Sequence, residues 1–347
     1  MPKTLPMTEA DASGGQACPS GALPRQRPRI ALLSNPKSTG NLAQLPRIRE
    51  YCADHPDIFH YEVEHASQIG EAMKTIARVR PKVLAINGGD GTVQAALTEL
   101  YNGGHFGDAP PPVAVLPSGK TNLIALDLGA RGDPIAALER LIEVAQGDLA
   151  EHLVARELIA LRKDEAGPPV IGMFLGGAGL ADTMLYCRQK IYPLGLPNGL
   201  SHALTAVAAI LRLALKLKAG FLPPPPSQTE VLLRKDGRIS GRFAVLAVTT
   251  LEKLLLSGQV GGEGRGPLKL FAVEERATSV VRALLAALAG GYKGKKMRGI
   301  HFEEVDEITI ESENSSVILD GETFRTERGS PIHLRPAQPL SFVRLAA

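Results

Sequence analysis

The stretch VLAINGGDGTVQAALTEL, residues 83–100, decides the fold of this chain. It begins with a short apolar run, passes through a turn with three glycines and one aspartate, and continues with a helical spacing of apolar residues. Gly88 and Gly89 let a ligand approach the backbone where a Cβ atom would clash. A helix that starts at Thr92 would point free N–H groups at the same space, which favours anions such as phosphate. The stretch therefore predicts a buried strand, a phosphate-compatible turn and a helix.

Asp90, in the middle of this turn, has two interpretations. A carboxylate beside phosphate needs a cation between them, unless it accepts a proton from an attacking hydroxyl. Alternatively, Asp90 only caps a tight connection between strand and helix. The four residues Gly-Gly-Asp-Gly alone support both interpretations equally. Two similar turns in the first half of the chain favour the functional one.

Residues 29–146 alternate between strand-like and helical patterns. Short apolar runs occupy 30–33, 60–63, 83–86 and 113–116, and helical patterns occupy 42–52, 69–79, 93–100 and 122–128. This alternation predicts a parallel sheet covered on both faces. Ligands of such sheets bind beyond the carboxyl ends of the strands. Three polar, glycine-containing turns lie there: SNPKSTG (34–40), NGGDGT (87–92) and PSGKTN (117–122).

The pattern changes after about residue 150. Strand-like segments occupy 154–162, 170–175, 231–233, 243–248, 268–273, 307–310, 317–319, 332–334 and 342–345. Residues 235–238 are a hairpin signal between two of them, and helical patterns interrupt the series at 200–218 and 278–289. We therefore predict an α/β fold in which an N-terminal α/β domain with a parallel sheet precedes a C-terminal antiparallel β domain.

Composition narrows the classes of function. The chain has 347 residues, a net charge of +3 and no tryptophan. No basic stripe interleaved with aromatic side chains is present, so no nucleic-acid partner is expected. Cys18, Cys52 and Cys187 share no metal-binding spacing and suit a reducing compartment. No apolar run reaches the roughly 18 residues of a spanning helix, so we expect a cytoplasmic protein.

The triplet Gly119-Lys120-Thr121 looks like the end of a Walker phosphate loop. Such a loop needs a glycine five residues before the Gly-Lys pair, so that a long loop can wrap phosphate. That position is Ala114, inside an apolar run. The sequence therefore excludes a P-loop, and the short turn needs another explanation.

Four motifs together carry a family resemblance. They are Asn35-Pro36 with Ser38 and Gly40, then Gly88 to Thr92, then Leu116-Pro117 with Gly119, Thr121 and Asn122, and finally Asp320-Gly321-Glu322. In order and spacing they resemble the diacylglycerol kinase catalytic family, which includes bacterial lipid kinases, sphingosine kinases and ceramide kinases. The resemblance implies an α/β ATP-binding domain at 29–150 and a β-sandwich lipid-substrate domain at 151–347, whose last strand can return to the first domain. Residues 1–28, rich in Pro, Gly, Ser and Ala, are predicted to be a disordered tail.

The resemblance also implies roles for individual residues and a metal. It implies that ATP is held by Asn35, Ser38, Gly88, Gly89, Gly91, Thr92, Gly119 and Thr121. Asp90 would act at the phosphate and hold Mg²⁺, and Glu322 would accept the proton of the attacking hydroxyl. Lys120 would add a cation near phosphate or remain a solvated lysine. His65 and Ser67 fall where the family often contacts the nucleotide.

Two positions depart from the family pattern. Many bacterial diacylglycerol kinases have an aspartate directly after the asparagine of the turn at 117–122, and Leu123 stands there instead. Sphingosine kinases also have an apolar residue at this position, so Leu123 favours ceramide or a sphingoid base over diacylglycerol. The second departure is Thr249-Thr250 followed by the turn GGEGRGP at 261–267.

The predicted function is therefore that of an ATP- and Mg²⁺-dependent lipid kinase. Its acceptor would be a primary hydroxyl of ceramide, a sphingoid base or diacylglycerol. Two alternatives stay open: an NAD kinase, whose family shares Gly-Gly-Asp-Gly, and a catalytically silent sensor of lipid or nucleotide. We expect a membrane lipid as partner, transient contact with the inner face of the membrane, and no nucleic acid, and an oligomer is left open.

The helical pattern at 200–218 bears on membrane contact. Its apolar residues recur at Leu200, Leu204, Val207, Leu211 and Leu215, and Arg212, Lys216 and Lys218 gather near its end. This spacing is typical of an interfacial helix with basic anchors. The more common interpretation is a helix that packs its apolar face on the β domain. Lys293, Lys295, Lys296 and Arg298 follow the second helical pattern and would contact anionic headgroups or solvent.

Overall fold

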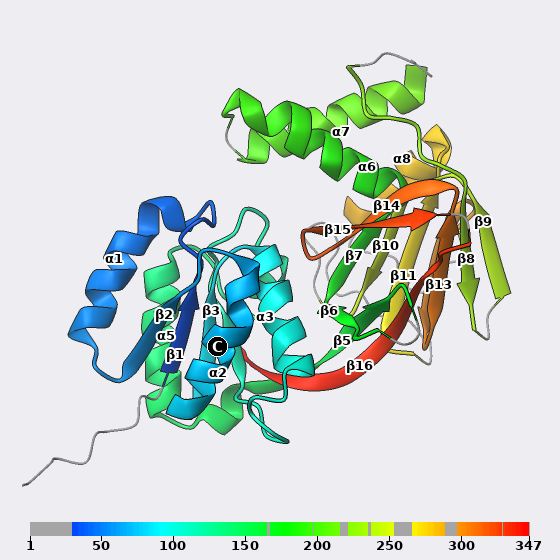
Figure 1. Cartoon of the computed structure of the whole chain (residues 1–347). Coiled ribbons are helices and arrows are strands. Elements are labelled where there is room, and N and C mark those ends of the chain that lie inside the picture. Colours follow the sequence, from blue (N-terminus) through cyan, green and yellow to red (C-terminus); the bar gives the residue numbers. More distant parts are fainter. Residues whose placement is uncertain are drawn as a thin grey trace, which may run out of the picture.

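The computed structural model describes residues 30–164, 167–196, 198–215, 221–234, 237–252, 266–288, 297–327 and 329–346. These residues form two halves that share one long sheet, with a second sheet in the C-terminal half (Figure 1). The predicted tail at 1–28, the turn at 261–264 and the lysines at 216, 218, 293, 295 and 296 lie outside the described residues.

A parallel sheet forms the N-terminal half. Its strands are β2 (Ile58–Glu62), β1 (Ile30–Ser34), β3 (Val83–Asn87) and β4 (Val113–Val115), in that order. β1, β3 and β4 are buried throughout, as expected for strands covered on both faces. The covering helices are α1 (Asn41–Asp54), α2 (Ile69–Val79), α3 (Asp90–Asn102), α4 (Leu123–Asp127) and α5 (Pro134–Gln146). α1 packs beside α5 and α2 beside α3, so helices lie on both faces of the sheet.

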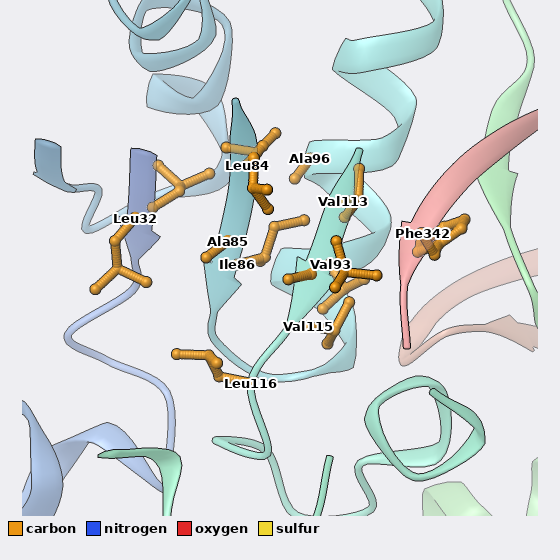
Figure 2. Packing of buried hydrophobic residues seen from close by; sticks show 14 of the residues in the cluster. Leu32, Leu84, Ala85, Ile86, Val93, Ala96, Val113, Val115, Leu116 and Phe342 are labelled. Carbon is orange, nitrogen blue, oxygen red and sulfur yellow. The ribbon is translucent and has the colours of Figure 1, made fainter. Parts of the chain in front are cut away.

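The last strand, β16 (Ile332–Val343), joins the two halves. It pairs in parallel with β4, where Phe342 faces Val113, and antiparallel with β5 (Leu153–Arg162) and β13 (Ile308–Ser312). Figure 2 shows Phe342 in the hydrophobic core of the N-terminal half, with Val113 and Val93. The prediction of two separate strands at 332–334 and 342–345 is wrong, because both segments belong to this one strand.

Beyond β13 the same sheet continues with β8 (Thr229–Leu233) and β9 (Gly237–Gly241), while β6 (Val170–Gly172) pairs with β5. β8 pairs antiparallel with β9, so the hairpin signal at 235–238 leads into β9. The prediction that it joins 231–233 directly to 243–248 is wrong. β9 was missed because Gly237–Gly241 has two glycines and no apolar alternation.

The second sheet is antiparallel throughout. Its order is β12 (Ile300–Val305), β11 (Leu268–Glu274), β10 (Phe243–Thr249), β7 (Phe174–Gly177), β14 (Asn314–Leu319) and β15 (Glu322–Glu327). A hydrophobic cluster fills the space between the two sheets and includes Val231, Ile308 and Leu334 of one and Leu246 and Leu270 of the other. The predicted fold class, a parallel α/β half followed by an antiparallel β half, is confirmed.

Helices of the C-terminal half lie outside both sheets. α6 (Ala178–Tyr186) packs on β7, β10 and β14, and a π-helical turn (Cys187–Ile191) and a short 3₁₀ turn (Tyr192–Leu194) lead from it to α7 (Asn198–Leu215). α6 lies between α7 and the second sheet (Figure 1). α8 (Ala277–Leu288) packs on β11 and beside α7. None of the helices in the described part of the chain combines the length and hydropathy that a membrane crossing requires.

A buried ion-pair network connects the halves. The Arg156 guanidinium of β5 donates from Nε to Asp127 Oδ2 of α4 over 3.1 Å and from Nη1 to Glu252 Oε1 over 2.7 Å. The backbone N–H of Glu252 donates to the other oxygen of Asp127 over 3.0 Å. Because the side chains of Arg156 and Asp127 are 5% and 0% exposed, this network fixes the end of β10 against α4.

Candidate active site

A cleft of about 560 Å³ lies between the two halves of the molecule. From the N-terminal half it is lined by the turns after β1, β3 and β4, at the carboxyl ends of these parallel strands. From the C-terminal half it is lined by α6, the π-helical turn, α7 and the tight turn between β14 and β15. The cleft is thus placed where parallel α/β sheets bind ligands.

The turn after β3 aims the start of α3 at this cleft. α3 begins at Asp90, two residues earlier than predicted, and Gly89 is its N-cap in an extended conformation. The N–H groups of the first turn of this 13-residue helix therefore face the cleft. The Oγ1 of Thr92 accepts a hydrogen bond of 2.9 Å from the Asn35 side chain, which ties the turn after β1 to α3. Such a helix start favours a phosphate group.

Three glycines of this site place backbone without a Cβ atom where side chains would clash or would occupy the cleft. A Cβ atom on Gly88 would lie 2.7 Å from that of Thr92, so Gly88 is required for the packing of the helix start. Gly89 and Gly119 approach each other closely: a Cβ atom on Gly119 would lie 3.0 Å from the Cα of Gly89. A Cβ atom on Gly89 would meet nothing closer than the Ser38 hydroxyl at 3.5 Å. The space above Gly89 is therefore open to a ligand.

The turn after β4 explains the Gly-Lys-Thr triplet. Gly119 donates its N–H to Asn122 Oδ1 over 2.6 Å, and the Asn122 side chain donates back to the Gly119 carbonyl over 3.0 Å. Asn122 has a φ of +54°, the left-handed conformation that asparagine tolerates better than most residues. The turn is thus closed by its own asparagine and presents Lys120 and Thr121 to the cleft.

A buried polar network holds the three turns together. The Ser118 hydroxyl donates to Asn87 Oδ1, and Asn87 Nδ2 donates to Ser34 Oγ over 2.9 Å. Asn41 Nδ2 donates to the Asn87 carbonyl over 2.9 Å, and Ser38 Oγ donates to the Ser118 carbonyl over 2.8 Å. These groups are buried, so each satisfied hydrogen bond helps to fix the relative position of the turns. No role was predicted for Asn41, Asn87 or Ser118.

Asp320 and Gly321 form the two-residue turn between β14 and β15, and Glu322 is the first residue of β15. Asp320 and Gly321 have φ values of +41° and +98°, as a type I′ hairpin turn requires. The Asp320 carboxylate accepts hydrogen bonds from the N–H groups of Met173 and Phe174 over 2.6 and 3.0 Å. Its role is therefore to fix the turn on the break between β6 and β7.

Glu322 reaches across the cleft to the start of α3. A Cβ atom on Gly91 would lie 2.8 Å from Glu322 Oε1, so the carboxylate lies against the first turn of the helix. Glu322 itself is exposed, and both it and Asp90 line the cleft. The structure thus brings together the two predicted catalytic carboxylates, although they are 232 residues apart in sequence.

Burial raises the pKa of two acidic groups in this region. Burial raises the pKa of Asp90 to about 6, and the nearby Arg188 guanidinium opposes this rise. Burial also raises the pKa of Asp320 to about 8, with the Asp90 charge adding to the rise, while the N–H donors of Met173 and Phe174 oppose it. The charge of Asp90 therefore changes at a pH close to neutral.

Two residues from the C-terminal half complete the cleft and were not predicted. Arg188, in the π-helical turn, lies near Asp90 and Gly321. Tyr192 follows it, and the Lys120 ammonium lies 3.6 Å from the centre of the Tyr192 ring. Nothing near these residues in sequence points to the cleft, since their partners come from the other half of the chain.

Most of the predicted site residues do line the cleft. They are Asn35, Ser38, Gly89, Asp90, Gly91, Thr92, Gly119, Thr121 and Glu322. Gly88 does not line it and instead packs against Thr92. His65 lines it and lies 3.1 Å from the Lys37 ammonium, whereas Ser67 does not. Leu123 is not part of the lining and packs, half-buried, on the core of the N-terminal half.

The residues present fit a nucleotide with a magnesium ion. Within the described residues, no group of three or more His, Cys, Asp or Glu side chains could hold a metal by itself. Mg²⁺ in kinases is commonly held by one or two carboxylates together with the phosphates of the nucleotide. Asp90 beside a bare helix start supplies such a carboxylate at a place suited to phosphate. The opposite wall is partly apolar, with Leu180, Met184 and Ala206.

Comparisons with known proteins agree with this geometry. Residues 29–151 match the family model described as the diacylglycerol kinase catalytic domain. Two solved structures from Bacillus anthracis str. Sterne, one named as a candidate diacylglycerol kinase and one as a diacylglycerol kinase, resemble the chain with TM-scores of 0.62 and 0.57. Each has 16% sequence identity and covers 91% of this chain and 97% of its own. No curated protein matches the chain. The family model confirms the predicted resemblance for residues 29–151, and the solved structures confirm the fold over most of the chain.

Proposed function

We propose that the chain transfers the γ-phosphoryl group of ATP to a primary hydroxyl of a membrane lipid, because residues 29–151 match the family model of the diacylglycerol kinase catalytic domain. The observation that carries the proposal is the meeting of Asp90 at the start of α3 with Glu322 from the opposite wall. Phosphoryl transfer depends mainly on positioning, charge neutralisation and acceptance of the hydroxyl proton. In this cleft, the first turn of α3 would position the phosphates. Asp90 with a cation would neutralise charge, and Glu322 on the opposite wall would accept the proton.

In this proposal the N-terminal wall of the cleft binds the nucleotide, and the C-terminal wall activates the acceptor. The N–H groups of the first turn of α3 and the backbone around Gly89 and Gly119 bind the phosphates. Asp90 holds Mg²⁺, which neutralises charge on the transferred group when it is bound. Glu322, exposed in the cleft, accepts the proton of the lipid hydroxyl. Arg188 adds positive charge on the side of the acceptor.

The acceptor is proposed to be ceramide or a sphingoid base, with diacylglycerol as the other candidate. Leu123 supports the preference by its place in the sequence alone, because its side chain packs on the core and does not line the cleft. The apolar side chains of Leu180, Met184 and Ala206 suit acyl or alkyl chains in general. We further propose that the protein acts in the cytoplasm, at the inner face of the membrane.

The test is a side-by-side assay of ATP-dependent phosphorylation of ceramide, sphingosine, diacylglycerol and NAD by the purified protein, with lipids in mixed micelles. We expect one lipid to be strongly preferred and turnover to stop when EDTA removes Mg²⁺. Turnover of NAD alone would establish the NAD kinase alternative. Nucleotide binding without turnover of any acceptor would favour the silent sensor.

Matched variants test the two carboxylates. Asp90→Asn and Glu322→Gln should each lower kcat by about 100-fold or more, a range typical of a lost general base or metal ligand. Asp54→Asn and Glu50→Gln make the same chemical changes at exposed positions of α1 and should leave kcat unchanged. Full activity in both cleft variants would contradict the assigned roles.

A further inference from the structure

α7 is placed with its apolar face outward. Along this helix the large side chains of Leu204, Val207 and Leu211 are 41%, 52% and 45% exposed. The side chains it buries are instead small and polar: Ser201 and Thr205 are 0% and 4% exposed. A helix that covers a β domain buries its apolar face. The structure therefore contradicts the expectation that the apolar face of this helix packs on the β domain.

α8 likewise exposes its large apolar side chains and buries small ones. Val281, Leu284 and Leu285 are 55%, 46% and 60% exposed, while the small residues Ser279 and Ala283 are buried. α8 packs beside α7, so the exposed apolar side chains of both helices lie on neighbouring elements. We call these six residues, Leu204, Val207, Leu211, Val281, Leu284 and Leu285, the outer face. Exposed apolar side chains gathered on two neighbouring helices are typical of a binding surface.

The two segments that carry the outer face contain basic residues and no acidic ones. Residues 183–229, which contain α7, have five Lys or Arg and no Asp or Glu, and residues 277–302, which contain α8, have the same counts. These ten cations exceed the net charge of +3 of the whole chain, so the rest of the chain is net acidic. Among those the structure describes, Arg188, Lys190, Arg282 and Arg298 are exposed. Arg212 of α7 pairs with Glu275 over 2.9 Å, so the exposed cations of the two segments are the ones available to anions. Exposed apolar side chains on segments with such cations fit an anionic lipid surface.

The outer face is also continuous with the candidate active site. His202, Thr205 and Ala206 of α7 line the cleft, while Leu204 and Val207, their neighbours on the same helix, point outward. A surface that bound α7 would therefore lie directly beside the acceptor side of the cleft. A lipid acceptor could then present its hydroxyl to Glu322 while its chains stay in the bilayer.

From these observations we propose that the outer face of α7 and α8 docks on the surface of a bilayer that contains anionic lipids. The idea that docking delivers the acceptor to the cleft rests on the proposed lipid kinase function. Docking on a bilayer does not depend on that function. The cations give attraction to the headgroups, and the leucine and valine side chains enter the boundary between headgroups and acyl chains.

The test is co-sedimentation of the full chain with vesicles of phosphatidylcholine, with and without phosphatidylglycerol. The variant carries Leu204→Ser, Val207→Ser and Leu211→Ser. The control carries Leu42→Ser, Leu153→Ser and Leu232→Ser, three changes of the same kind at side chains that are 73%, 39% and 38% exposed elsewhere. We expect tighter binding to the anionic vesicles, about a tenfold or greater loss of affinity in the variant, and no loss in the control. Added salt should weaken binding of the wild type.

Two results would overturn the proposal. One is vesicle binding by the variant equal to that of the wild type. The other is a wild-type dimer that the variant dissociates, with no vesicle binding by either protein, because the outer face would then be an interface between two copies of the chain.

A parallel kinase assay separates this proposal from the proposed function. The variant should phosphorylate a water-soluble short-chain lipid at the wild-type rate and lose activity only on vesicle-embedded lipid. Specific vesicle binding by a protein that turns over no lipid would retain docking and reject the kinase. Lipid turnover that is unchanged by the variant on both kinds of acceptor would retain the kinase and reject docking.

Discussion

The Lys120 ammonium lies 3.6 Å from the centre of the Tyr192 ring and so joins the two walls of the cleft. Lys120 comes from the turn after β4, and Tyr192 comes from the turn that follows α6. Cation–π contacts of this kind contribute about 0.5–2 kcal/mol, depending on their exposure to water. The contact therefore places a positive charge at the candidate phosphate side of the cleft.

Lys120→Met should raise the KM for ATP by about tenfold, because it removes a cation close to the proposed phosphate site. Tyr192→Phe keeps an aromatic ring beneath the ammonium and should leave the KM near that of the wild type. Tyr192→Ala removes the ring and should raise the KM by about two- to fivefold. Steady-state kinetics with ATP as the varied substrate measure all three. Equal KM values for Lys120→Met and the wild type would show that Lys120 is only a solvated lysine.

The pH dependence of activity should report the raised pKa of Asp90. Its value of about 6 predicts that kcat/KM rises with pH through this region, since the ionised carboxylate is the active form. Arg188→Met removes a charge that favours the ionised form, so the acidic limb of the profile should move to higher pH. Profiles of kcat/KM for the two proteins between about pH 5 and 8 check this. An identical acidic limb in both would contradict the coupling between Arg188 and Asp90.

Asp90 should also affect stability in the opposite sense to activity. Its folded pKa lies above its ordinary value of 3.8, so the folded state binds more protons than the unfolded state between pH 3.8 and about 6. The wild type therefore loses stability as pH rises through this window, by about 1–2 kcal/mol after allowing for solvent in the cleft. Asp90→Asn has no such loss, so its Tm relative to the wild type should increase from pH 4 to pH 7. Asp54→Asn, on the exposed surface of α1, should show no such trend.

Within the motif at 320–322, two acidic residues should give opposite phenotypes. Asp320→Asn replaces one accepting oxygen with an N–H₂ group that faces a backbone donor, Met173 or Phe174. We expect a loss of about 2–3 kcal/mol in the free energy of unfolding. Glu322→Gln lies at an exposed position and should leave stability unchanged while lowering kcat. Chemical denaturation and kinetics on both variants distinguish a structural from a catalytic carboxylate.

Gly89→Ala tests the open space above the start of α3. A methyl group there meets nothing closer than 3.5 Å, so the variant should fold normally. It would occupy the place proposed for phosphate, and the KM for ATP should rise by about tenfold or more. Gly88→Ala is the contrasting variant, because its methyl group would lie 2.7 Å from Thr92 and should lower the Tm instead. An unchanged KM in Gly89→Ala would place the phosphates elsewhere.

The first half of the chain was predictable because its signals are local. Each buried strand is a short apolar run that ends in a polar turn, and the helix predicted at 69–79 coincides with α2. Parallel strands end at one edge of their sheet, so the turns at 34–40, 87–92 and 117–122 had to meet. The N-terminal wall of the candidate site could therefore be predicted from the polar turns and from the shared edge at which parallel strands end.

What the sequence missed depends on contacts between distant segments. Pro336 and Pro339 look like strand breakers, but they lie near a register shift between Ala337 and Leu340 in β16, where the strand tolerates residues without an N–H group. Arg188 is an isolated cation in sequence, and only folding brings it near Asp90. The periodicity of α7 predicted an amphipathic helix, but a period alone does not say which face meets the protein.

β16 also has a consequence for how the chain is made. Phe342, Val343 and Leu345 belong to the hydrophobic core of the N-terminal half, yet a ribosome adds them about 200 residues after the other strands of that half. The sheet that contains β1 therefore lacks its fifth strand, and the edge of β4 stays unpaired, until β16 has been synthesised. A fragment that ends near residue 151 would carry the catalytic turns but leave that edge permanently open. We expect such a fragment to aggregate, and a chain that includes β16 to complete its first sheet.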